Sequence, residues 1–181
     1  MALRDGRIAG RLAVSSGSRS PKPPTRPESS LPNLGGIFAS VLQRVAEPHR
    51  PLLIAIAERL AAERYRGWAK EPTMSGHAAQ LLACARREEE IAVRVEALFP
   101  GASSIQLEWL EKNPDLAEIN RSVFAGRSLP EQFRIQAQGE RLGAATWRAL
   151  ARKEENPVAR EVYLACAELE QASALVLEAI R

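Results

Sequence analysis

The chain has 181 residues, of which 45% are apolar and 5% aromatic, and its formal net charge is +3. This length and composition suit one domain whose core consists mainly of Ala, Leu, Val and Ile, which favours closely packed helices. Residues 1–33 carry a net charge of +4, so by subtraction the remainder is near −1. A basic face for specific nucleic-acid binding is therefore not indicated, and no apolar run reaches the roughly 18 residues that span a bilayer.

The N-terminal segment 1–36 is rich in Arg, Ser and Pro and ends at Gly35-Gly36. Such a segment buries too little apolar surface to offset the entropy lost on ordering. We therefore predict a disordered basic tail at 1–36 and a folded domain at 37–181. The tail lacks the amphipathic stretch of a transit peptide, and translation from a misassigned upstream start codon is an alternative origin.

The two cysteines bear on the cellular compartment, and the ratio of arginine to lysine bears on the source genome. Cys84 and Cys166 lie in the middle of helical patterns, as small core residues do, so we expect two free thiols in a reducing compartment, by default the cytoplasm. Arg outnumbers Lys by 21 to 4, which suggests a GC-rich, bacterial genome.

Helix signals follow in chain order. A short amphipathic piece is expected at 37–46. The breaker residues Pro72, Pro100-Gly101 and Asn156 then delimit four long helices. These are predicted at about 48–70, 75–99, 130–155 and 157 to the C-terminus, with Ser75 as a candidate cap of the second.

The connection at 100–129 is too long to join neighbouring antiparallel helices directly. It contains one apolar helical stretch, Ile105–Leu110, and a turn at Asn113-Pro114. A connection of this length can run back along helices of about 25 residues, which are about 38 Å long. The expected topology is up, down, crossover, down, up.

An internal repeat supports this topology, because the chain aligns with itself without gaps at an offset of 82 residues. Residues 55–70 align with 137–152 and residues 82–97 with 164–179. The matched identities include Glu58/Glu140, Arg59/Arg141, Arg66/Arg148, Cys84/Cys166, Glu88/Glu170 and Glu96/Glu178. Each half is thus predicted to be a helix pair with one inward glutamate per helix.

Four glutamates, Glu58, Glu88, Glu140 and Glu170, are therefore expected at one level of a four-helix bundle. Small residues lie one turn away on each stripe, for example Ala61 and Gly143, and they leave room for carboxylates. In the run Arg86–Glu90 we expect only Glu88 to point inward. Four carboxylates at one level are the ligands of two-metal chemistry.

On these residues the chain resembles the ferritin-like superfamily, in particular rubrerythrin-type di-iron carboxylate bundles. The resemblance covers about 48–181 and includes the long crossover and an aromatic residue seven positions after a glutamate, Tyr65 and Trp147. It implies an all-α, ferritin-like four-helix bundle descended from a dinuclear metal protein. In that family the second and fourth helices carry Glu-x-x-His, whereas here Ile91 and Ser173 occupy the histidine positions.

The remaining histidines cannot substitute. His49 and His77 precede the nearest glutamates by nine and eleven residues, which is about 13 and 16 Å along a helix. The usual oxidation chemistry is then predicted to be lost or altered, because imidazole ligands set its geometry and redox potential. An oxygen-only set suits Mn, Mg or weakly bound Fe.

Several functional hypotheses follow from this. The first is a degenerate ferritin-like protein with a vestigial or carboxylate-only Fe or Mn site, and the second is a metal-free bundle that binds a protein partner or forms a homo-oligomer. The third is an oxidase-like enzyme in which Ser173 or water replaces imidazole. Without metal, the carboxyl groups must be protonated or paired with Arg59, Arg87 or Arg141. For Tyr65 and Tyr163 we expect packing roles rather than hydrogen bonds to carboxylates.

Overall fold

The computed structural model describes residues 31–180, and all regular elements within this range are helical. The all-α prediction is confirmed. Four long helices are α2 (Arg50–Ala69), α3 (Ala78–Glu96), α6 (Leu129–Lys153) and α7 (Pro157–Ala179). Shorter ones are α1 (Leu34–Leu42), α4 (Ala102–Lys112) and α5 (Leu116–Phe124), with 3₁₀ turns η1 (Glu47–His49) and η2 (Pro72–His77).

The N-terminal boundary differs from the expectation. The short helix predicted at 37–46 begins three residues earlier, at Leu34, inside the segment assigned to the tail. The side chain of Asn33 caps it by accepting a hydrogen bond from the Gly36 amide at 3.0 Å. Asn is a favoured N-cap residue, but the adjacent Gly35-Gly36 pair led to the prediction that the helix starts after it. The rest of the predicted tail, residues 1–30, lies outside the described residues.

Local capping chemistry fixes the ends of the long helices. Ser128 and Glu131 form a capping box at the start of α6, and the Asn156 side chain accepts a hydrogen bond from the Val158 amide at 2.9 Å at the start of α7. The proposed cap at Ser75 is wrong, because Ser75 lies inside η2 and α3 begins three residues later. Pro72 favours this tighter turn by restricting the chain before it.

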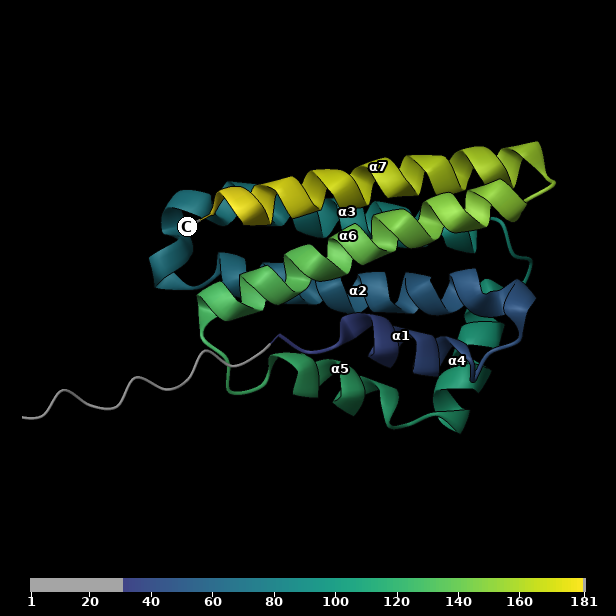
Figure 1. Cartoon of the computed structure of the whole chain (residues 1–181), viewed down its shortest axis with the longest axis horizontal. Helices are drawn as coiled ribbons and strands as arrows, with labels where there is room; N and C mark the ends of the chain where they lie inside the picture. The colour runs from purple at the N-terminus through teal and green to yellow at the C-terminus, as the bar shows by residue number, and fades with distance from the viewer. Residues whose placement is uncertain (1–30, 181) are drawn as a thin grey trace, which may run out of the picture. The chain divides into compact units, whose positions relative to one another are not determined.

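The long helices pack in two hairpins, α2 with α3 and α6 with α7, and α3 also contacts α7. Figure 1 shows that α6 runs opposite to α2 and α7, so that the chain passes back along the helices between the two hairpins. The connection that makes this return contains two helices, α4 and α5, where the sequence predicted only one. The second arises because Leu116, Ile119 and Val123 form an apolar stripe at helical spacing, of which Leu116 and Val123 are buried.

The apolar core of the long helices divides into two clusters. One contains Trp147 and Tyr163, with Cys166, and the other contains Tyr65 and Trp68, with Cys84. Both thiols are free and buried, as predicted. Along every long helix the glutamate falls between residues of the two clusters, as Glu58 does between Ala55 and Ala62. A layer of carboxyl groups therefore crosses the middle of an apolar core.

The repeat is visible in matched ion pairs on the outer faces of the two hairpins. Arg59 binds Glu96 and Arg141 binds Glu178, each through Nε and Nη2 on the two carboxylate oxygens. Both pairs join residues 37 apart, and the offset of 82 carries one pair onto the other. The two hairpins are thus built alike down to individual side-chain contacts.

Within residues 31–180, no helix combines the length and the apolar character needed to cross a membrane.

Candidate metal centre

All four predicted glutamates are buried, each on its own long helix. Glu88, Glu140 and Glu170 are 0%, 1% and 2% exposed, and Glu58 is 7% exposed. Of the run Arg86–Glu90 only Glu88 is buried, as expected. Helical spacing and flanking small residues were sufficient to predict this inward orientation.

Three of the four glutamates form a compact cluster. One carboxylate oxygen each from Glu58, Glu88 and Glu170 lies within 4.8 Å of the other two. The Glu58 carboxyl group is also within hydrogen-bonding reach of those of Glu88 and Glu170, and Glu170 is within reach of Glu140. The carboxyl groups of all four hairpin helices therefore form one connected set.

Neighbouring donors hold the carboxyl groups in place. Tyr65 Oη and Gln136 Nε2 both donate to Glu140 Oε1, at 2.7 Å. Trp147 Nε1 donates to Glu170 Oε1 at 3.0 Å, and Ser173 Oγ donates to Glu88 Oε1 at 2.7 Å. The expectation that Tyr65 only packs is wrong, whereas Tyr163 stacks on Trp147 at a centroid separation of 5.6 Å.

Two oxygens of the set are left over. Glu88 Oε2 and Glu140 Oε2 are buried and have no hydrogen-bond partner among residues 31–180. A buried acceptor without a partner is unfavourable by about 1 to 3 kcal/mol, and by more when charged. These two atoms are therefore available to a cation or to a further hydrogen-bond donor.

The environment of the cluster opposes ionisation. Burial, followed by the charge of Glu140, raises the pKa of Glu58 from 4.5 to about 8. Burial together with the charges of Glu140 and Glu58 raises the pKa of Glu88 well above its ordinary value, and burial together with the charges of Glu58 and Glu140 does the same for Glu170. Desolvation and like charges thus act in one direction, and both effects would be relieved by bound positive charge.

Gly143 makes room for one member of the cluster. A Cβ atom at this position would lie 2.3 Å from Glu170 Oε1 and 2.6 Å from its Cδ. Both distances are far below van der Waals contact. The glycine on α6 therefore allows the Glu170 carboxyl group of α7 to reach its place.

The ion pairs suggested between arginines and the four glutamates are wrong. Arg59 and Arg141 bind Glu96 and Glu178 on the surface, and Arg87 lies beside Cys84 Sγ at 3.5 Å. Instead, Arg64 is linked to Glu140 through a hydrogen-bonded side chain. Its Nε donates to Gln136 Oε1 at 3.1 Å. Gln136 in turn donates to Glu140, so the cation acts through an amide and not through a direct ion pair.

Arg64 was missed because its significance depends on other elements. Its Nη1 also donates to Asn120 Oδ1 at 3.2 Å, and its guanidinium lies 3.9 Å from the ring centroid of Phe124. Both partners belong to the unanticipated helix α5. Burial lowers the pKa of Arg64 to about 10, so the side chain stays cationic at neutral pH.

The histidines do not join the cluster. His49 and His77 occupy the N-cap positions of α2 and α3 without a capping hydrogen bond from their side chains, and His77 Nδ1 lies 3.0 Å from Gln80 Oε1. At the two histidine positions of the Glu-x-x-His pattern, Ile91 packs in the apolar core and Ser173 points its hydroxyl at Glu88. Within residues 31–180, the ligand atoms that this cluster offers to a metal ion are therefore carboxylate oxygens alone.

Comparisons with protein-family models, with curated proteins and with solved structures found no match to this chain.

Proposed function

We propose that this chain is a degenerate ferritin-like protein that holds a divalent metal ion, Mn²⁺ or Fe²⁺, between its buried glutamates. The observation that carries the proposal is the cluster of Glu58, Glu88 and Glu170, three buried carboxylates within 4.8 Å that form no ion pair with a cationic side chain of residues 31–180. Uncompensated carboxylates at such a site are strongly disfavoured. One or two divalent ions neutralise them directly.

The supporting hydrogen bonds fit metal ligation. Trp147 and Ser173 each donate to one oxygen of a cluster glutamate, as the outer partners of ligating carboxylates do. Glu140 would be the fourth ligand through its unpaired Oε2. An all-oxygen set favours hard ions such as Mn²⁺ and Mg²⁺ over ions that prefer imidazole or thiolate.

Metal content tests the proposal. The full chain, expressed with added Mn and Fe and purified without chelator or histidine tag, is expected to contain one to two ions per chain by mass spectrometry. The Glu88→Gln/Glu170→Gln variant is expected to contain less than about a tenth of that amount, because it loses two of the cluster's anionic ligands. Equal metal content in the two proteins would contradict the proposal.

The second candidate function, a homo-oligomer, is favoured by a different observation. Among the large apolar side chains of α3 and α7 that are at least 40% exposed, four are related in pairs by the repeat. They are Leu82 with Leu164, and Val93 with Leu175. Sedimentation of the wild type and of Val93→Glu/Leu175→Glu separates the candidates: a dimer that only the variant loses supports oligomerisation, and a monomeric wild type contradicts it.

An oxidase-like activity with Ser173 in place of a ligating histidine is the third candidate. The Ser173 hydroxyl lies 2.7 Å from Glu88 Oε1, at the edge of the cluster. Iron-loaded protein would then consume O₂, and Ser173→Ala would change the rate. An iron-loaded wild type that consumes no O₂ would remove this candidate.

A further inference from the structure

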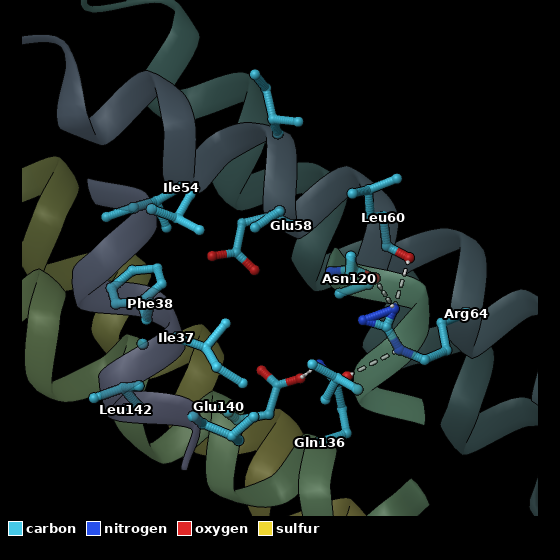
Figure 2. A pocket seen from close by; sticks show the side chains of 18 of the residues that line it. Ile37, Phe38, Ile54, Glu58, Leu60, Arg64, Asn120, Gln136, Glu140 and Leu142 are labelled. Atoms are coloured by element: carbon cyan, nitrogen blue, oxygen red, sulfur yellow. Dashed lines mark hydrogen bonds between the residues drawn. The ribbon is translucent and has the colours of Figure 1, made fainter. Parts of the chain in front are cut away.

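Beside the glutamate layer lies a pocket of about 200 Å³. Residues of α1, α2, α5 and α6 line it together with Glu170 of α7, and Figure 2 shows the carboxyl groups of Glu58 and Glu140 facing its open centre. Ile37 and Phe38 of α1 and Ile54 of α2 form an apolar wall on one side of this space. The pocket therefore joins an apolar chamber to the carboxyl cluster.

We infer that this pocket binds an uncharged, mainly apolar small molecule that carries one hydrogen-bond donor, a class represented by medium-chain alcohols. The volume sets the size, because an apolar cavity of about 150 Å³ accepts benzene. A pocket of about 200 Å³ therefore suits roughly six to ten carbon atoms. The apolar lining supplies most of the contact surface, as in other small-molecule sites.

The polar end of the ligand is specified by an unsatisfied acceptor. Glu140 lines the pocket, is 1% exposed and has no partner for Oε2. Its other oxygen already accepts hydrogen bonds from Tyr65 and Gln136. A hydroxyl group of the ligand would supply the donor that Oε2 lacks.

Charge excludes an anionic ligand, and the proposed metal site excludes a cationic one. Three carboxyl groups line the pocket, those of Glu58, Glu140 and Glu170, and they disfavour an anion. The guanidinium of Arg64 is already bound to Gln136, Asn120 and the Leu60 carbonyl. A cationic ligand would compete with the proposed metal for the same carboxylates.

The exposed fractions of the glutamates show on which side the cluster is open. Glu58 is the most exposed of the four glutamates, at 7%, and it lines the pocket, whereas Glu88 is 0% exposed and does not. The pocket is thus the side from which a small molecule approaches the cluster. The inference rests on the proposed metal site only for the exclusion of a cationic ligand.

The direct test is the binding of 1-octanol to the full chain, measured by calorimetry and by amide chemical shifts in NMR. We expect saturable binding with shifts concentrated in α1, α2 and α6 in the metal-free protein, in which Glu140 Oε2 is not occupied by a metal ion. Octanoate is expected to bind at least about tenfold weaker, a factor that corresponds to 1.4 kcal/mol. Octanol that does not saturate, or octanoate that binds equally well, would overturn the inference.

Two glycines provide a matched pair of variants. Gly139 lines the pocket, and a Cβ atom added there would meet no atom within 4 Å. A Cβ atom added at Gly67 on α2 would also meet no atom within 4 Å, but Gly67 does not line the pocket. Leucine favours a helix at both positions. Gly139→Leu is expected to weaken octanol binding at least tenfold and Gly67→Leu to leave it unchanged.

The same titrations separate this inference from the proposed function. Octanol binding without Mn²⁺ binding would contradict the metal site and support the pocket. Mn²⁺ binding without octanol binding would do the reverse. A Gly139→Leu protein that binds octanol like the wild type would overturn the inference, because its side chain fills the inferred site.

Discussion

Replacing Gly143 by alanine is expected to weaken metal binding on the order of 100-fold while the bundle stays folded. The added methyl group would overlap the Glu170 carboxyl group, whose Oε1 lies 2.3 Å from the position of the new Cβ. The carboxyl group is the far end of a flexible side chain, so it moves aside and the helix does not. The cluster of three then loses one ligand without any change in the number of glutamates.

Gly139→Ala is the control for this prediction. It lies one turn earlier on the same helix, and its Cβ would meet nothing within 4 Å. Alanine there is expected to raise the free energy of unfolding by about 0.5 to 1 kcal/mol and to leave metal affinity unchanged. Mn²⁺ titrations of both variants by calorimetry measure the difference. Unchanged affinity in Gly143→Ala would contradict the role of Glu170 as a ligand.

The metal-free protein is expected to become less stable as the pH rises from 5.5 to 8. The pKa of Glu58 is 4.5 as its ordinary value and about 8 in the folded chain, so in this window the folded state binds more protons than the unfolded state. The unfolding free energy then falls with rising pH. Its full value is present below pH 4.5, and the loss from Glu58 is on the order of 5 kcal/mol by pH 8.

Saturating Mn²⁺ is expected to reverse the sign of this dependence. Metal competes with protons for the same carboxylates, so its affinity, and with it the stability of the loaded protein, rises with pH. Urea denaturation midpoints at pH 5.5 and 8, with and without Mn²⁺, measure both slopes. Glu96, Asp115, Glu131 and Glu178 do not interfere, because surface partners lower their pKa values and they titrate below this window.

A variant with two of the three titrating groups removed completes this experiment. Glu58→Gln/Glu170→Gln is expected to lose less stability between pH 5.5 and 8 than the wild type, because of the three groups only Glu88 is left, and to be almost insensitive to Mn²⁺. In the metal-free state at pH 8 it should be more stable than the wild type, because folding no longer buries the carboxyl groups of Glu58 and Glu170, which are ionised in the unfolded chain at this pH. A metal-free wild type that gains stability between pH 5.5 and 8 would contradict the assigned burial of the carboxyl groups.

The positions of the four glutamates were predictable because their burial is a property of each helix by itself. Ala55 and Ala62 around Glu58, or Cys84 and Ala85 before Glu88, define the buried stripe without knowledge of the neighbouring helix. The role of small residues as space for carboxyl groups was likewise visible at Gly143. The internal repeat then transferred each inference from one hairpin to the other.

The donors to the glutamates were not predictable, because each contact depends on how separate elements pack. Tyr65 and Trp147 are related by the repeat, yet Tyr65 donates to Glu140 of the other hairpin and Trp147 to Glu170 of its own. Their different lengths and donor positions break the symmetry. Arg64 gained its role through Asn120 on α5, a helix whose nine residues give only a weak periodic signal.

The pocket depends on packing in the same way. Its wall includes Ile37 and Phe38 of α1, a helix that the sequence suggested only as a short amphipathic piece. Nothing in the spacing of these residues says which side of the bundle they cover. The sequence therefore predicted the layer of glutamates but not the apolar chamber beside it.

Anomalous X-ray diffraction from crystals of the full chain soaked in Mn²⁺ tests the central claim most directly. We expect a peak within about 2.0 to 2.6 Å of carboxylate oxygens from Glu58, Glu88 and Glu170, the range of hard divalent ions on oxygen ligands. The peak should be absent from Glu88→Gln/Glu170→Gln crystals soaked in the same way. Wild-type crystals without density between these three residues at pH 8 would contradict the account.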